Sequence, residues 1–372
     1  MKSANKGWLL LQACLLILAI ASINACDAEG AKDHLTIHQG LSGVQFISVG
    51  DDDQVLYISL DDANNVWLAT ATDTVFHLSL ESKNIQPIGF PEEYSIAAMA
   101  ADPSWVYVGT TTNGMWIYKK ASKQWERLQP SSGELPGWVS AIFPEPEYLW
   151  IGGASLYQFN RKTGAVTRFE DPKIETSSIT QIIRVDESSL YIAGPKGVHR
   201  FYENTRTFEN IIPKCVFQDP EIPKLCQDSS IPRSQIFPFQ GGFWAMAECD
   251  PPADSTGDSP SGSAQASVTM IAKWSGLMKL EWSDQTKSCQ LFPLRGGRYA
   301  LLAKEDKLFI GSHKGVLRFH PEQQTYRQIS FGIPQADEDQ EVTALADTGG
   351  YLIAGVEEGV WVVPWHLLLE GD

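Results

Sequence analysis

Positive charge is scarce in this sequence of 372 residues. Its 29 lysines and arginines stand against 45 aspartates and glutamates, which gives a formal net charge of −16 and a pI of about 4.9. An acidic chain of this kind repels phosphate backbones, and no basic cluster is visible, so no nucleic-acid partner is expected. With 43% hydrophobic residues, the chain can build a large core, which excludes disorder as a description of the whole protein.

Local signatures of catalysis are also missing. The chain has no GxSxG elbow, HExxH pair, phosphate-binding loop or Rossmann fingerprint, so no motif points to a hydrolase, a metalloprotease or a nucleotide site. The aspartate runs at 51–53 and 61–62 lack the spacing of a closed calcium loop, and we interpret them as solvated turn carboxylates. We therefore expect no metal and no cofactor, and no catalytic residue is identified.

The only long apolar run lies at the N-terminus. Lys2 and Lys6 precede an almost uncharged stretch over residues 8–21, which is too short to span a bilayer stably. This pattern predicts a signal peptide over residues 1–25. The following junction, INAC at 23–26, resembles a bacterial lipobox, and in lipoproteins the cysteine at this place becomes the lipidated first residue, which here is Cys26.

The lipobox resemblance implies a place at the bacterial cell envelope. A lipid on Cys26 would hold a short tether, residues 26–34, and a periplasm-facing domain at the membrane. In enteric lipoproteins an aspartate after the lipidated cysteine, here Asp27, implies retention at the inner membrane; plain secretion is the alternative. Loss of residues 1–25 removes Lys2 and Lys6 and takes the net charge from −16 to −18.

Cysteine is rare, with six residues in the chain. Four of them lie beyond Cys26, and an even number in an exported protein predicts two disulfides, for which three connectivities are possible. Buried free thiols are the alternative, and zinc is not expected because no CxxC pair is present. The four residues are Cys215, Cys226, Cys249 and Cys289.

An internal repeat is the main positive signal in the sequence. Seven similar tetrads, such as VWLA, VYVG and LWIG, start at residues 66, 106, 149, 190, 243, 308 and 351. The second position is aromatic in six of them, the fourth is usually small, and a second strand-like tetrad follows each. A period near 42 residues with β-branched and aromatic runs is typical of a four-stranded propeller blade.

The repeat predicts an all-β fold, a seven-bladed β-propeller of four-stranded antiparallel blades over residues 35–372. The last repeat has no fourth strand after it, and residues 35–38 are expected to supply that strand and close the ring. Three motif tryptophans, Trp67, Trp150 and Trp244, occupy repeated strand positions, and we expect them to pack between neighbouring blades.

The segment 149–169, "LWIGG…LYQFNRKTGAVTRF", resembles the two-component regulator propeller repeat. Blades of this family occur in periplasmic sensor regions of bacterial hybrid histidine kinases and in stand-alone exported proteins. The resemblance implies the fold, together with recognition of glycans or other extracellular cues. This chain shows no membrane helix or kinase after the repeats, so a signal would have to pass to a separate protein.

Two long spacings between repeats predict insertions. Residues 212–233 separate the fourth and fifth repeats, and residues 249–267 lie inside the fifth. In a propeller, both would rise from the face on which the second and third strands of a blade connect and successive blades join. The second insertion is rich in Ser, Gly and Pro, a composition that cannot order itself by burial. Each is a recognition flap, a tolerated decoration or a processing site.

The short loops of the same face offer candidate binding residues. For each polar residue taken singly, a solvated turn is the alternative, and Trp138 either packs between blades or forms an exposed stacking platform. The candidates are Trp138, Asn113, Lys196, His313, Lys314, Glu357 and Glu358, with Asp73 in an equivalent turn.

These observations predict a lipid-anchored envelope protein that binds a partner protein or a glycan and acts as a sensor or an assembly adaptor. The alternative is a propeller enzyme, a lyase or hydrolase acting on a polysaccharide or a cyclic substrate. Such an enzyme would take its histidines and carboxylates from separate blades around the channel and leave no local motif. His199, His313 and His320 are the histidines that could take part.

Overall fold

The computed structural model describes residues 31–38, 43–50, 53–61, 65–91, 95–171, 179–194, 197–210, 236–239, 242–249, 274–282, 287–294, 297–312, 315–323, 325–332 and 340–369. The predicted signal peptide, Cys26 and nearly all of both predicted insertions lie outside these ranges. Within them, no helix is long and apolar enough to cross a membrane.

The described chain is almost entirely β-structure, arranged as seven sheets. Six sheets have four strands in antiparallel order, and the remaining one has five. We number the sheets along the chain. Sheets 1 to 3 hold β3 (Val55–Leu60), β4 (Val66–Thr70), β5 (Val75–Ser79) and β6 (Asn84–Pro87); β7 (Ile96–Ala101), β8 (Trp105–Thr110), β9 (Met115–Lys119) and β10 (Gln124–Arg127); and β11 (Ala141–Pro144), β12 (Tyr148–Gly152), β13 (Leu156–Asn160) and β14 (Val166–Phe169).

The remaining sheets follow the same plan. Sheets 4 to 7 hold β15 (Gln181–Asp186), β16 (Ser189–Gly194), β17 (Gly197–Tyr202) and β18 (Thr207–Asn210); β19 (Ile236–Phe239), β20 (Gly242–Cys249), β21 (Trp274–Trp282) and β22 (Lys287–Leu294); β23 (Gly297–Lys304), β24 (Lys307–Ser312), β25 (Gly315–His320) and β26 (Thr325–Gly332); and β27 (Ala344–Asp347), β28 (Tyr351–Val356) and β29 (Gly359–Pro364). The short helix α3 (Trp365–Leu369) follows β29.

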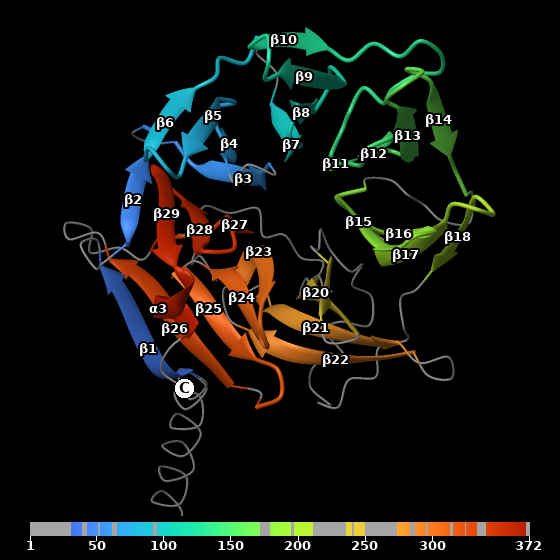
Figure 1. Ribbon diagram of the computed structural model, residues 1–372. Coiled ribbons are helices and arrows are strands. Elements are labelled where there is room, and N and C mark those ends of the chain that lie inside the picture. The colour runs from blue at the N-terminus through green and yellow to red at the C-terminus, as the bar shows by residue number, and fades with distance from the viewer. Residues whose placement is uncertain are drawn as a thin grey trace, which may run out of the picture.

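The sheets lie around a common centre with their first strands innermost (Figure 1). Neighbouring first strands contact one another: β27 with β3, β3 with β7, β7 with β11, β11 with β15, β19 with β23, and β23 with β27. This is a propeller-like arrangement, and the four-strand plan predicted from the repeat is confirmed.

The expected N-terminal strand of the last sheet is present, but it is a different segment. Sheet 7 is completed by β2 (Gln45–Ser48), which pairs antiparallel with β29. Residues 35–38 belong instead to β1 (Ala31–His38), which pairs parallel with β26 at the edge of sheet 6. The difference has a packing reason: Phe46 of β2 lies 5.3 Å from the Trp361 ring, between centroids, so β2 brings an aromatic contact to the last sheet.

The small fourth residue of the repeat has a steric cause. A Cβ added to Gly109 would lie 2.5 Å from Cγ1 of Val139, and one added to Gly152 would lie 2.6 Å from Cγ2 of Ile179. Each of these branched residues lies two positions before the first strand of the next sheet, so the glycine makes room where one sheet passes to the next. In sheet 7 this position is Gly355, opposite Ala344, so the tetrad there starts one residue later than the sequence alignment of repeats places it.

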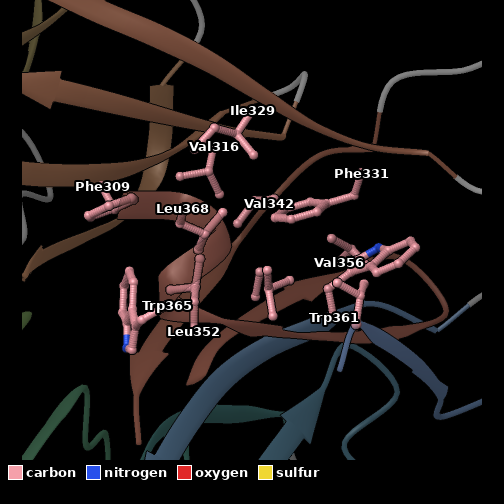
Figure 2. Packing of buried hydrophobic residues seen from close by; sticks show 13 residues of the cluster. Phe309, Val316, Ile329, Phe331, Val342, Leu352, Val356, Trp361, Trp365 and Leu368 are labelled. Atoms are coloured by element: carbon pink, nitrogen blue, oxygen red, sulfur yellow. The ribbon is translucent and has the colours of Figure 1, made fainter. Parts of the chain in front are cut away.

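Apolar side chains fill the spaces between neighbouring sheets. Between sheets 6 and 7, Phe309 and Trp361 are fully buried, and helix α3 adds Trp365 and Leu368 to the same cluster (Figure 2). Trp67 and Trp150 are buried in the corresponding layers, so their predicted packing role is confirmed. Trp244 lies in β20, where the structure does not describe side chains.

The sheet plan defines two faces. The loop face carries the connections between second and third strands and those between successive sheets. The turn face carries the turns between first and second and between third and fourth strands. Both predicted insertions connect strand ends at the loop face, since one joins β18 to β19 and the other joins β20 to β21.

Candidate functional site

The structure brings part of the predicted binding residues together. Asn113 and Trp138 lie side by side where sheet 2 meets sheet 3, because the Gly114 amide donates to the Gly137 carbonyl at 2.7 Å. Glu357 and Glu358 are exposed in the β28–β29 turn, where sheet 7 meets sheet 1. Lys196, His313 and Lys314 lie outside the described residues, as do Cys215 and Cys226. Cys249 ends β20 and Cys289 lies in β22, and the disulfides and the lipid on Cys26 stay predictions.

Trp138 is an exposed indole on a fixed backbone. The Val139 amide donates to the Thr110 carbonyl at 3.0 Å, which ties the segment to sheet 2. On the other side, a Cβ on Gly153 would lie 2.5 Å from the Trp138 carbonyl oxygen, so the segment also presses on sheet 3. The side chain nevertheless keeps 43% of its surface exposed, one of two large hydrophobic side chains to do so among the described residues. Of the two predicted placements, packing between blades or exposure, exposure is the one observed, and a stacking role stays a prediction.

The turn beside Trp138 is preorganised by its own threonine. Thr110 Oγ1 donates to the Gly114 carbonyl at 3.0 Å and accepts from the Asn113 amide at 2.9 Å. The Thr111 amide donates to the Ser95 carbonyl at 3.0 Å, which fixes the turn to the start of sheet 2. The half-exposed Asn113, whose carboxamide has donors and an acceptor, therefore lies on a fixed turn that adjoins the Trp138 segment through the Gly114–Gly137 hydrogen bond.

Two carboxylates of this face are structural. Asp53 is 7% exposed and accepts from the amide and the hydroxyl of Thr72 at 3.1 and 2.7 Å. Asp73 accepts from the Ile96 amide at 2.6 Å, so it links the hairpin of sheet 1 to the first strand of sheet 2. The interpretation of both as solvated turn residues is wrong, because Asp53 is buried and binds Thr72, and Asp73 accepts from the amide that begins the first strand of the next sheet.

The two described histidines considered for an enzyme are far apart in the fold. His320 ends β25 at the turn face, with Nε2 3.0 Å from Oδ2 of Asp306. His199 begins β17 near the loop face and is 5% exposed. Among the described residues, no group of three or more His, Cys, Asp or Glu side chains could hold a metal ion.

His199 gives the fold a pH dependence. Burial lowers the pKa of His199, Asp171 opposes this shift, and the buried Nδ1 has no hydrogen-bond partner among the described residues. The unfolded chain takes up the proton near the ordinary value of 6.5, before the folded chain does, so stability should fall as the pH drops below about 6.5. Between pH 7.5 and 5, the unfolding free energy of His199→Phe should therefore decrease less than that of the wild type. Urea unfolding at the two pH values measures this difference. His77, whose pKa burial also lowers, should keep its own part of the decrease; an unchanged pH profile in His199→Phe would contradict the assignment.

On the turn face, the repeated aromatic residue carries a hydrogen bond that repeats with it. Trp67 Nε1 donates to Asp61 at 3.3 Å, Tyr107 Oη to Asp102 at 2.6 Å, and Trp150 Nε1 to Glu145 at 2.8 Å. In each case the carboxylate lies in the turn between the first and second strands of the same sheet. An acidic residue five or six positions before the aromatic one is the sequence signal for this contact. The contact was not predicted from this signal.

The same carboxylates receive a cation from the next sheet. Lys120 of sheet 2 lies 2.6 Å from Asp61 of sheet 1, and Arg161 of sheet 3 lies 2.8 Å from Asp102 of sheet 2. Burial alone would raise the pKa of Asp102, but hydrogen bonds from Tyr107 and two backbone amides, together with the Arg161 charge, lower it. The turn face is thus joined from sheet to sheet by ion pairs.

Sheet 4 reverses this pattern. The residue equivalent to Lys120 and Arg161 is Glu203. Each of the three directly follows the third strand of its sheet and donates its amide to a carbonyl in the turn between the first and second strands; for Glu203 this is the Ser188 carbonyl. Arg184 of β15 compensates by bridging Glu145 of sheet 3 and Glu203. Its Nε and Nη2 donate to the two Glu145 oxygens at 2.8 and 2.7 Å.

The chain is similar in fold to several solved propellers. The extracellular domain of the putative hybrid two component system BT4673 from B. thetaiotaomicron matches with a TM-score of 0.63 and 15% identity over 86% of this chain and 39% of that domain. The corresponding domain of BT3049 from the same organism gives 0.60 and 12% over 86% of this chain and 41% of that domain. This chain therefore spans about two-fifths of the length of those two domains.

A third match has nearly the same length as this chain. YCF48, solved bound to D1 peptide, gives a TM-score of 0.59 and 10% identity over 88% of this chain and 98% of that protein. No family model and no curated protein sequence matches the chain. At these identities the likeness establishes the propeller fold.

Proposed function

We propose that this chain is a seven-bladed recognition propeller of the bacterial cell envelope, anchored by a lipid on Cys26. It recognises a partner protein or a glycan with its loop face and acts as a sensor or an assembly adaptor. Each of the seven sheets is one blade, and β2 closes the ring by joining the N-terminal segment to the last blade. The extracellular domains of similar fold support the envelope location.

The observation that carries this proposal is Trp138. Its large apolar side chain is 43% exposed, so a bound ligand would remove that surface from water. Because its backbone is fixed from two sides, binding would cost little conformational freedom. Asn113 beside it can fix the orientation of a polar ligand group by hydrogen bonds. Exposed Glu357 and Glu358 extend the face toward blade 7, and the two predicted insertions connect strands that end at this face in blades 4 and 5.

Replacing Trp138 by alanine should abolish most ligand capture without unfolding the ring. Aromatic anchors at the centre of an interface commonly contribute 2 kcal/mol or more, so we expect at least about a tenfold loss of affinity. The measurement is crosslinking of the mature protein in cells, followed by identification of the bound species and titration with it, together with a glycan array.

The matched control is Tyr351→Ala. Tyr351 is the other large exposed hydrophobic side chain, at 39%, and it lies on the turn face. This variant should bind like the wild type, and both variants should keep the wild-type melting temperature. Equal binding by Trp138→Ala and the wild type would contradict the proposal that the loop face recognises the ligand.

A further inference from the structure

The N-terminal segment enters the propeller from the turn face. In the parallel register of β1 with β26, Ala31 lies opposite Tyr326 and His38 lies opposite Gly332 (Figure 1). Tyr326 follows directly on the turn between the third and fourth strands of sheet 6, and Gly332 leads toward the next sheet. The chain therefore arrives at the turn face and crosses the ring edge toward the loop face.

The connection from this entry point to the lipidation site is short. Four residues separate Ala31 from Cys26, so the two Cα atoms can be at most about 17 Å apart even in a fully extended chain. This limit rests on the lipid anchor proposed above. A lipid on Cys26 would thus hold the turn face near the bilayer, and the loop face with Trp138 would point away from it.

The outermost turns of the turn face carry basic residues. In blades 1 to 4, the turns before the fourth strands span residues 80–83, 120–123, 161–164 and 203–206, and they hold six lysines and arginines against two glutamates. Two of the cations, Lys120 and Arg161, are committed to ion pairs. The four others are exposed: Lys83, Lys123, Lys162 and Arg206.

Three of these cations occupy a backbone position that favours glycine. Lys83, Lys123 and Arg206 each have φ of 57°, and Gly164 with φ of 74° holds the corresponding place in blade 3. A side chain in this left-handed region is strained by roughly 1 kcal/mol relative to glycine. Basic residues are thus kept at three tips where glycine would be more stable. Exposed carboxylates share this face: Glu81 and Glu322 lie on the turns before the fourth strands of sheets 1 and 6, and Glu147, Glu187 and Glu305 lie on turns between first and second strands.

We propose that the turn face lies against the lipid surface, with Lys83, Lys123, Lys162 and Arg206 contacting anionic headgroups and the loop face directed away. Two independent features place it there, the entry of the tethered chain and the basic turn tips. Basic residues near an anionic bilayer each strengthen binding about fivefold.

The orientation is tested with the lipidated full-length protein bound to vesicles. A fluorescent amino acid replaces Lys123 on the turn face or Asn113 on the loop face, and the vesicles contain a quencher on the lipid headgroup. We expect strong quenching at position 123 and little at position 113. Equal quenching at both positions, or stronger quenching at 113, would overturn the proposal.

The cations are tested without the lipid, in the mature chain carrying Cys26→Ser. Binding is compared on vesicles of phosphatidylcholine with and without phosphatidylglycerol. Lys123→Gln with Arg206→Gln should lower binding to the anionic vesicles by at least about tenfold, following the contribution of each residue. The control, Arg127→Gln with Arg168→Gln, removes the same charge from exposed strand residues near the loop face and should change it little.

Equal losses in the two double variants would contradict a role for the turn tips. The proposed function and the proposed orientation of the turn face can fail independently. Mass spectrometry of the native protein reports whether Cys26 is acylated, and ligand capture by Trp138→Ala reports on the loop face. Neither result depends on where the turn face lies.

Discussion

Alanine at Gly109 is expected to destabilise the propeller by about 2 kcal/mol or more. A Cβ there would lie 2.5 Å from Cγ1 and 2.7 Å from the carbonyl oxygen of Val139, and the carbonyl belongs to the backbone and cannot swing aside. Overpacking of this kind commonly costs about 1–3 kcal/mol, and here it acts at the junction between blades 2 and 3. Because Val139 follows Trp138 directly, ligand capture should fall as well. Urea unfolding and a binding titration measure the two effects.

Gly89→Ala is the matched control. A Cβ at Gly89 would meet nothing within 4 Å, and its φ lies outside the left-handed region. The same chemical change should therefore be neutral or stabilise by a few tenths of a kcal/mol, through the lower entropy of the unfolded chain. If both variants lost stability equally, steric closure at the blade junction would not be the reason for the small residue in the repeat.

Removing Arg184 should destabilise the protein by about 2–3 kcal/mol. The change Arg184→Met leaves Glu145 and Glu203 facing each other without a cation, and both side chains are only 20–24% exposed. Uncompensated buried charge commonly costs about 3–5 kcal/mol, and partial exposure reduces this figure. The measurement is the free energy of unfolding in urea at pH 7.

Adding Glu203→Gln to Arg184→Met should restore part of the lost stability, because it removes the repulsion between the two carboxylates. Arg168→Met serves as a comparison, since Arg168 pairs with Glu170 at side chains that are 52% and 56% exposed, and such a pair is worth less than about 1 kcal/mol. A double variant no more stable than Arg184→Met, or an equal loss in Arg168→Met, would show that the bridge between blades 3 and 4 is not required.

The sequence predicts the blade plan well because the repeat is a packing requirement. Gly109 and Gly152 are small because Val139 and Ile179 press on them, and Trp67 and Trp150 are aromatic because they fill the layers between blades. These constraints recur in most blades, so they appear as a period near 42 residues, and Met246 in the fifth repeat and Leu352 in the seventh depart from the pattern. In blade 7, Gly355 carries the constraint one residue later.

The parts that sequence reasoning missed depend on contacts between distant segments. Whether β1 or β2 completes blade 7 is decided by Phe46 against Trp361, more than 300 residues apart in the chain. The bonds from Asp53 and Asp73 to neighbouring loops, and the reversed charge at Glu203 with Arg184, likewise join different blades or turns. The basic tips lie about forty residues apart in the sequence and form one rim only when the blades are assembled.

The residues of the candidate site could be named from the sequence, but their contacts and exposure could not, because these depend on segments from different blades. Asn113 and Trp138 were named from the positions of their loops, and the structure shows that they adjoin through the Gly114–Gly137 hydrogen bond. The sequence could not choose between a packed and an exposed Trp138, because that choice depends on how closely the segment presses on Gly153.

The most direct test of the proposed recognition face is photo-crosslinking in living cells from both faces of the same protein. A photoreactive amino acid replaces Asn113 on the loop face or Ser122 on the turn face, and adducts are compared by mass. Recognition through the loop face predicts a discrete protein or glycan adduct at position 113 that disappears in Trp138→Ala, and no such adduct at position 122. A discrete adduct at 122 alone, or one at 113 that survives Trp138→Ala, would contradict it.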